Sequence, residues 1–297
     1  MPMYDKTVTA DEAAAKIPDR AFVAVGGVNT AGTPMEVIDA IVDRYKKEGH
    51  PSKIDITNSG NNWYTKQFAV EGLLGVYYAG FPSMDYKSAD GGFTDNNKIP
   101  VFHFTQGIGT QLYLAQAAKT PYLTKVGIDT YIDPRIDGAC ANEKAKEFAD
   151  KHPIVKIVEI DGEEYLHFDL PPITVALIRA TTADTDGNLT DREESIKNEI
   201  LPMAMAAHNN GGIVIAQVNH IVEPGQIHAA EVKVPGMLVD YVVQCTDQKR
   251  WAPQNLAMVL GGATEYNPGL TGYCNVARAR IPFDAWTPSG TKVMMAR

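Results

Sequence analysis

The stretch "RAFVAVGGVNTAGTPMEVIDAIVDRYKKEG", residues 20–49, carries three structural signals in succession. Its apolar run "AFVAV" predicts a buried strand, and that strand ends in two glycines. Pro34 then stands at a first helical position, apolar residues recur on one helical stripe, and Gly49 ends the pattern. A strand, a glycine loop and a helix in this order predict the first unit of an α/β fold.

Apolar runs and amphipathic patterns keep alternating along the rest of the chain. This alternation predicts an open, mostly parallel sheet with helices on both faces. A hairpin over 154–170, with Asp161 and Gly162 at its turn, interrupts the pattern. Strands are expected at 53–60, 75–81, 99–107, 173–183 and 211–218, and helices at 9–17, where Thr9 and Glu12 form a capping box, 65–74, 109–120 and 192–210.

Composition narrows the class of protein. The 297 residues carry a formal net charge of -9, and 44% of them are hydrophobic, so a globular core is expected. Without a basic field or a Lys/Arg run, nucleic acid and anionic membranes are not expected partners, and a small molecule is. No apolar run approaches the length of a membrane span, and the three cysteines are widely spaced, so we expect a cytoplasmic protein without disulfides.

The glycine loop that follows the first strand does not match a nucleotide-binding motif. Thr33 stands where a P-loop needs lysine, and Pro34 takes the place of its Ser/Thr. Gly26, Gly27 and Gly32 do not have the spacing of a dinucleotide fingerprint either. Two interpretations remain open: the backbone N–H groups approach an anionic or oxyanionic group beside the helix N-terminus, or the loop is a tight turn without a ligand.

Polar residues follow two more of the expected strands. Gln106 and Gly107 end the strand at 99–107, where Gln106 either donates to a substrate carbonyl or carboxylate or bonds its own backbone in a turn. The carboxyl ends of strands in an open α/β sheet form the ligand crevice, so both places are candidate binding sites. The candidate substrate pocket after the strand at 53–60 consists of Asn58, Ser59, Asn61 and Asn62, with a surface loop as the alternative.

Other candidate motifs are weaker. Glu223, on the turn "VEPG", is a conceivable nucleophile, but its residue type and position are also those of an exposed loop carboxylate. The segment "ADTDGNLT", residues 183–190, lacks the ligands of a calcium loop and predicts an Asp-Gly turn instead. The histidines and cysteines have no metal-ligand spacing, so we expect no metal site.

Six segments, in the same order along the chain, resemble family I CoA-transferases of the propionate/acetoacetate type. They are "AVGGVNTAGTP", "TKVGIDTYIDPR", "VEIDGEEYL", "VALIRATTADTDGNLT", "GGIVIAQV" and "VKVPGMLVDYVV". The resemblance implies exchange of CoA between an acyl-CoA and a carboxylate by a ping-pong route through a glutamyl-CoA thioester. It also places Gly26, Gly27 and Gly32 at the active site, and Gln106 with Gly107 at a substrate or oxyanion contact, although Thr105 stands where related chains often have proline.

The family's nucleophilic glutamate lies in the second, β half, and the resemblance covers only the α half. Residues 1–297 are therefore expected to form an α-type domain or subunit, with 251–297 an extended excursion toward the β half. The expected function is that of the α subunit of a short-chain acyl-CoA:carboxylate CoA-transferase. A β subunit supplies the glutamate, CoA thioester is a substrate, and no cofactor is tightly bound. The alternatives are a thioester hydrolase that uses Glu223 and a non-catalytic scaffold subunit.

Overall fold

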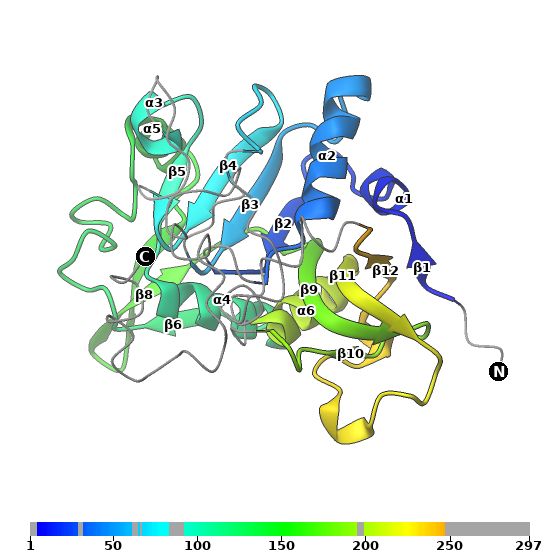
Figure 1. Cartoon of the computed structure of the whole chain (residues 1–297). Helices are drawn as coiled ribbons and strands as arrows, with labels where there is room; N and C mark the ends of the chain where they lie inside the picture. The colour runs from blue at the N-terminus through cyan, green and yellow to red at the C-terminus, as the bar shows by residue number, and fades with distance from the viewer. Residues whose placement is uncertain are drawn as a thin grey trace, which may run out of the picture.

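A computed structural model describes residues 5–28, 32–60, 65, 67–82, 92–194 and 199–246. Within these residues the chain forms a nine-stranded sheet (Figure 1), in which every strand pair is parallel except that of β10 (Leu189–Thr190) with β9. The order across the sheet is β1 (Thr7–Val8), β12 (Tyr241–Gln244), β11 (Ile213–Val222), β9 (Val175–Asp184), β2 (Phe22–Val25), β3 (Ile54–Asn58), β4 (Leu74–Ala79) and β5 (Val101–His103).

Helices cover both faces of this sheet, as the sequence predicts. Successive strand residues point to opposite faces, so Val23 and Val25 of β2 pack with α1 (Ala10–Ala15) and α2 (Met35–Glu48). Phe22 and Ala24 pack on the other side, with α4 (Gln106–Ala118) and α6 (Ile200–Asn209). Figure 1 shows these helices on either side of the sheet. Two apolar layers therefore sandwich the central strands.

A second, three-stranded antiparallel sheet lies beside the far end of the first one. It consists of β6 (Tyr122–Thr124), β8 (Glu163–Phe168) and β7 (Val155–Ile160), and Phe168 packs edge-on against Phe104 just after β5. The turn between β7 and β8 has Asp161 and Gly162 at φ 53° and 81°, as its Asp-Gly sequence predicts. The short elements are α3 (Phe93–Asn96), α5 (Glu143–Ala149), η3 (Ala229–Glu231) and η4 (Gly236–Leu238).

Local capping signals are confirmed at the first two helices. Thr9 and Glu12 form the predicted capping box: the Thr9 side chain accepts from the Glu12 N–H, and the Glu12 carboxylate accepts from the Thr9 N–H. Helix α2 ends at Gly49, which adopts the left-handed conformation with φ 77°. The helix starts at Met35, one residue later than predicted, so that Pro34 occupies the N-cap position and not the first helical position.

Two predicted helices differ from the structure. The described residues of 65–74 form turns up to β4, because Gly72 has φ 85° and Phe68 closes a turn onto the carbonyl of Thr65. The helix predicted over 192–210 starts only at Ile200, since 192–194 is a turn and 195–198 lie outside the described residues. The excursion expected at 251–297 also lies outside them.

Candidate active site at the carboxyl edge of the sheet

The parallel strands β2 to β5 end at one edge of the sheet, and the segments that follow them come together there. β2 leads into Gly26 and Gly27, β3 into Ser59, and β4 into Gly80, while β5 leads through Thr105 into α4. Figure 1 shows the four strands running in the same direction. The carboxyl edge of such a sheet is where ligands bind in open α/β folds.

The glycine loop turns back on itself directly after β2. The Gly26 N–H donates to the carbonyl of Leu177 on β9 at 2.8 Å. A Cβ atom on Gly26 would lie 3.3 Å from that carbonyl and 3.7 Å from the carbonyl oxygen of Gly32. Gly27 and Gly32 have φ 109° and 69°, in the region that side-chain-bearing residues avoid. The backbone conformation therefore favours glycine at positions 27 and 32, and a side chain on Gly26 would be tightly packed.

The first N–H groups of α2 are already satisfied. The carbonyl of Thr33 accepts from Met35, and the Gln217 side chain on β11 accepts from Glu36 at 2.9 Å and Val37 at 3.3 Å. Pro34 has no N–H, so this helix end offers no open anion site through these groups. An oxyanionic group at this edge would have to be met by the N–H groups of the glycine loop itself.

The glycine loop, the end of β3 and the start of α4 are in close contact. A Cβ atom on Gly60 would lie 3.0 Å from the Val28 side chain, and one on Gly109 would lie 3.2 Å from the Ser59 Cα atom. A Cβ atom on Gly80 would overlap the carbonyl oxygen of Ser59. Segments that are distant in sequence therefore converge on Ser59 and Gly60, and the small residues make this approach possible.

Of the predicted pocket residues, Asn58 and Ser59 are brought to this edge in different ways. Asn58 is buried, and its amide donates to the Tyr77 hydroxyl at 2.9 Å, so it holds β3 to β4. Ser59 is also buried, and its hydroxyl donates to the Glu199 carboxylate at 3.0 Å. Asn61 and Asn62 lie outside the described residues.

Gln106 and Gly107 form the first turn of α4 and are exposed, where the sequence predicted the end of a strand. Thr105 is extended, with φ -68° and ψ 151°, and its hydroxyl caps the helix by accepting from the Ile108 N–H. Thr105 thus starts the helix three residues earlier than predicted. A Cβ atom on Gly107 would meet nothing within 4 Å, so the space beside it is open.

Glu199 is a further residue of this edge that no sequence motif marks. It stands directly before α6, and its carboxylate accepts from Ser59 Oγ at 3.0 Å and from Thr110 Oγ1 at 2.7 Å. It thereby connects α6 with the end of β3 and the first turns of α4. A glutamate inside a predicted helix gives no signal in the sequence, because its partners come from elements far away along the chain.

Strand β9 carries a buried polar cluster, two residues beyond the point where it pairs with the end of β2. Arg179 on β9 is 1% exposed, and its guanidinium meets Glu194 Oε1 at 3.4 Å and Asn219 Oδ1 at 3.1 Å. A buried guanidinium requires such partners, since an unpaired charge in the interior is very costly. The cluster ties the segment after β10 to β9 and β11.

Glu223, the alternative nucleophile, lies on an exposed turn after β11. Its N–H donates to the Gln226 side chain at 3.2 Å, and the Gln226 N–H returns to the Glu223 carbonyl. These contacts belong to the turn itself, in agreement with the interpretation as a loop carboxylate.

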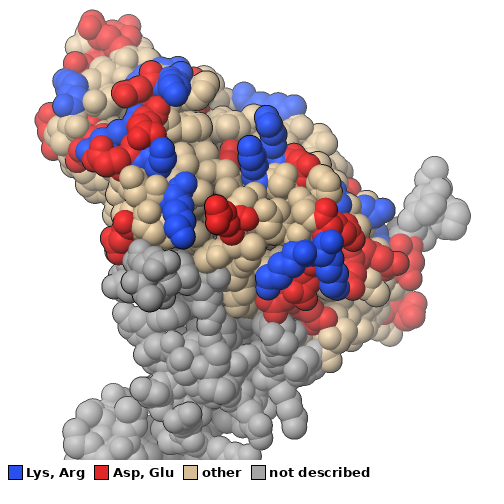
Figure 2. Space-filling model, turned by 90° about the horizontal axis from the view of Figure 1, so that it is seen from above, with Lys and Arg blue, Asp and Glu red and all other residues tan. Residues whose placement is uncertain are grey.

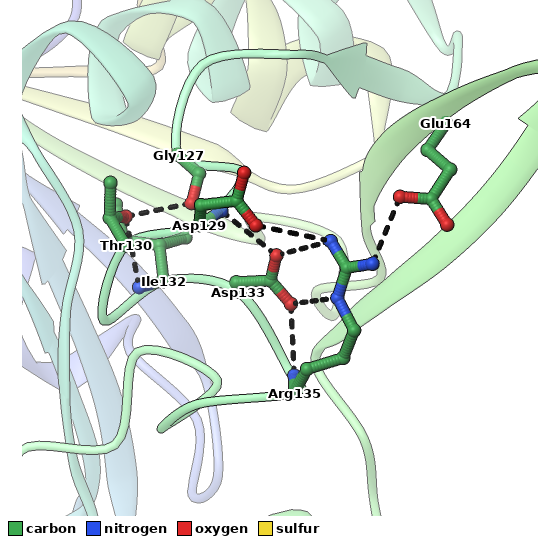
Figure 3. Close-up of polar contacts among 7 residues, drawn as sticks. All are labelled: Gly127, Asp129, Thr130, Ile132, Asp133, Arg135 and Glu164. Atoms are coloured by element: carbon green, nitrogen blue, oxygen red, sulfur yellow. Dashed lines mark hydrogen bonds and ion pairs between the residues drawn. The ribbon is translucent and has the colours of Figure 1, made fainter.

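The segment "TKVGIDTYIDPR" folds into a compact loop beside β5. Asp133 is fully buried and accepts from the Arg135 guanidinium at 3.0 and 2.7 Å, while Arg135 also reaches Glu164 on β8 (Figure 3). The Arg135 guanidinium holds the pKa of Asp133 well below its usual range. The loop meets the sheet where the Tyr131 ring stacks on His103, with 4.9 Å between ring centroids. This motif therefore has a structural role at the end of the sheet.

The surface charges alternate in sign on the face seen from above in Figure 2, where Lys and Arg stand among Asp and Glu. On α5, Lys144 pairs with Glu147 and Lys146 with Glu143. In the part of the chain that the structure describes, no helix is long and apolar enough to cross a membrane. The same residues contain no cluster of three or more His, Cys, Asp or Glu that is arranged to hold a metal ion.

Comparison with known proteins identifies the family of this chain. The family model described as Coenzyme A transferase matches residues 7–245. The chain belongs to the coenzyme A transferase family. It is 34% identical to the caffeate CoA-transferase of Acetobacterium woodii, over 98% of this chain and 54% of that protein.

Two further CoA-transferases differ in length. The acetate CoA-transferase YdiF of Escherichia coli O157:H7 is 36% identical over 82% of this chain and 46% of its own. Its crystal structure superposes with a TM-score of 0.76 at 33% identity, over 84% of this chain and 48% of that one. One subunit of the 3-oxoadipate CoA-transferase of Acinetobacter baylyi is 29% identical over 81% of this chain and 95% of its own. The chain thus spans about half the length of the caffeate and acetate CoA-transferases, whereas its match to the 3-oxoadipate enzyme covers nearly the whole of a separate subunit.

Proposed function

We propose that this chain is the α-type half of a short-chain acyl-CoA:carboxylate CoA-transferase, and that it acts together with a second, β-type half. The observation that carries this proposal is the convergence of the glycine loop and the start of α4 on Ser59 and Gly60, at the end of β3. The match to nearly all of one separate subunit in the 3-oxoadipate enzyme, and to about half of the longer relatives, supports the need for a second half. The acetate CoA-transferase among the relatives supports a short-chain acid.

The proposed reaction proceeds in two half-reactions on a glutamate that the second half supplies. The glutamate carboxylate attacks the thioester carbonyl and expels the CoA thiolate, which leaves an acyl-glutamyl anhydride. The thiolate then attacks the glutamyl carbonyl, releases the first carboxylate and forms a glutamyl-CoA thioester. The incoming carboxylate runs the same steps in reverse. Splitting the transfer in this way replaces one difficult step by several easier ones.

This chain would contribute the groups that meet negative charge on the acyl oxygen. Gly26, Gly27 and Gly32 keep this loop free of side chains, so that a ligand would come close to its backbone. The Gly26 N–H is donated to Leu177, so other N–H groups of the loop would stabilise the oxyanion. Gln106 and Gly107 start α4 beside open space and would contact the acyl group or the acid. Asn58 and Ser59 would form the wall of the substrate pocket, with Asn61 and Asn62 following them in the chain. CoA thioester is a substrate in this scheme, with no tightly bound cofactor.

A reconstitution experiment tests the proposal. The chain is assayed alone and together with the β-type half, either as a partner chain or as the remainder of a longer polypeptide. We expect CoA transfer from acetyl-CoA to propionate only when both halves are present. Robust transfer by this chain alone, abolished by Glu223→Ala, would show that the nucleophile lies in this chain.

The same assay separates the other functions. A thioester hydrolase releases free CoA at the same rate with and without an acceptor acid, whereas a transferase needs the acid. A scaffold subunit gives no transfer with any β-type half. We also propose a cytoplasmic location, because three widely spaced cysteines in the sequence are typical of a protein from a reducing compartment.

A further inference from the structure

Glu199 directs its side chain to other elements and away from its own helix. It occupies the N-cap position of α6, yet it makes no side-chain hydrogen bond to that helix. Its two oxygens accept from Ser59 after β3 and from Thr110 in α4, at 3.0 and 2.7 Å. The carboxylate therefore lies against the segments that form the candidate site.

Among the residues that the structure describes, no cation forms an ion pair with the Glu199 carboxylate. Both of its hydrogen-bond donors are neutral hydroxyls. Burial raises the pKa of the nearby Tyr113 hydroxyl, and the charge of Glu199 adds to that rise. The half-buried carboxylate thus makes its surroundings electronegative.

Ser59 is closely packed, and its hydroxyl group is already used by Glu199. Gly80 and Gly109 pack against its backbone without room for a side chain. This wall of the site therefore presents a negative charge, with the Ser59 hydrogen unavailable to a substrate. A second carboxylate on an acid that extends toward Ser59 would meet like charge, and like charges placed together are unfavourable.

We propose that Glu199 is a specificity-determining residue, which makes this site accept acids with one carboxylate and reject dicarboxylic acids. The inference rests on the proposed function, because it takes the acyl chain to extend from the glycine loop toward Ser59. Glu199 lies outside the set of groups that touch the reacting atoms, and it acts on the far end of the acid.

The test compares the wild type with Glu199→Gln in the complete enzyme, with both halves present. Glutamine keeps one oxygen acceptor and offers its amide to the other hydroxyl, so the fold is retained while the charge is removed. The readout is kcat/KM for CoA transfer from acetyl-CoA to succinate or glutarate, divided by that for propionate or butyrate. We expect the wild type to favour the monocarboxylic acids.

In Glu199→Gln we expect this ratio to rise about tenfold, mainly through KM for the dicarboxylic acids, which corresponds to a like-charge interaction of about 1.4 kcal/mol. Glu199→Asp retains the charge and should retain the wild-type ratio. Glu193→Gln makes the same substitution on an exposed side chain of the neighbouring segment and should also leave the ratio unchanged. A wild-type preference for succinate, or an unchanged ratio in Glu199→Gln, would overturn the inference.

Calorimetric titration of propionate and succinate into the same proteins keeps the two proposals separable. If the wild type transfers no CoA but the ratio of dissociation constants shifts in Glu199→Gln, the proposed function fails and the specificity inference stands. If transfer is normal and neither ratio shifts, the inference fails alone.

Discussion

The side-chain oxygen of Gln217 on β11 accepts hydrogen bonds from the backbone N–H of Glu36 at 2.9 Å and of Val37 at 3.3 Å. Gln217 is completely buried, and it lies 181 positions after Glu36 in the chain. The Glu36 carboxylate in turn accepts from the backbone and hydroxyl of Thr246, just after β12. The start of α2, and with it the end of the glycine loop, is thus anchored by strands from the other half of the sheet.

Replacing this anchor should weaken both stability and activity. In Gln217→Leu two N–H groups lose their acceptor in the interior, so we expect a loss of about 1–3 kcal/mol in the free energy of unfolding, measured by urea titration. Because α2 starts directly after the glycine loop, kcat/KM of the complete enzyme should also fall. Gln116→Leu is the matched control: Gln116 accepts from the Ile173 N–H at 2.7 Å near the other end of α4, and its loss should cost stability without changing kcat/KM. Full activity in Gln217→Leu would contradict this link.

Two glycines with positive φ provide a second matched pair. Gly27→Ala and Gly49→Ala each place a side chain in the left-handed region, and each should cost about 1 kcal/mol of stability. A Cβ atom on Gly49 meets nothing within 4 Å, at the far end of α2 from the loop. We therefore expect Gly27→Ala, and not Gly49→Ala, to lower the rate of CoA transfer by the complete enzyme. Equal rates in the two variants would mean that the glycine loop is a turn without a role in binding.

Asp55 on β3 should make the stability of the fold decrease as the pH rises. Burial raises its pKa to about 6, although the Val76 N–H donates to its carboxylate at 2.8 Å. A carboxyl group whose folded-state pKa is raised stabilises the fold fully below its ordinary value of about 4, and this contribution is lost as the pH rises through 6. Asp55→Asn keeps the acceptor for Val76 and removes the charge.

We expect the stability of Asp55→Asn relative to the wild type to increase by about 1–2 kcal/mol between pH 4.5 and pH 8. Thermal or urea unfolding of both proteins across this range measures the difference. A difference that does not change with pH would show that Asp55 remains ionised throughout.

Arg135 should contribute to stability with the opposite pH dependence. It lowers the pKa of the buried Asp133. A carboxyl group with a lowered folded-state pKa stabilises the fold fully above its ordinary pKa, and this contribution to stability is lost as the pH falls through the folded-state pKa. Arg135→Leu leaves Asp133 ionised and without this partner at neutral pH. We expect a clear loss of stability at pH 7 that shrinks toward pH 3, as urea unfolding at both pH values would show.

The exposed Arg192 provides the control, since its guanidinium nitrogen lies 3.7 Å from a carboxylate oxygen of Glu231. An exposed ion pair contributes little, so Arg192→Leu should change stability little at either pH. If Arg135→Leu lost the same stability at pH 3 as at pH 7, side-chain packing would explain the effect better than charge.

Much of the fold follows from local sequence patterns. The apolar strands, the Asp161–Gly162 turn, the Thr9 capping box and the Gly49 helix end depend on residues close together in the chain, and each is confirmed. The predicted helices that differ from the structure also have local causes, which the hydrophobic pattern does not reveal. Turns closed by the Phe68 N–H on the Thr65 carbonyl and by the Leu73 N–H on the Val70 carbonyl replace the helix predicted at 65–74. The Thr105 cap starts α4 early, so that Gln106 lies in a helix.

Periodicity and contiguous motifs were enough to predict the class of fold, the glycine loop and the resemblance to CoA-transferases. Only the tertiary structure showed that Ser59 and Thr110 hold the Glu199 carboxylate and that Gln217 occupies the start of α2. The reason is physical: a parallel sheet brings the ends of distant strands to one edge, so hydrogen bonds there join residues with no proximity in the chain. The edge, and with it the candidate site, exists only in the folded protein.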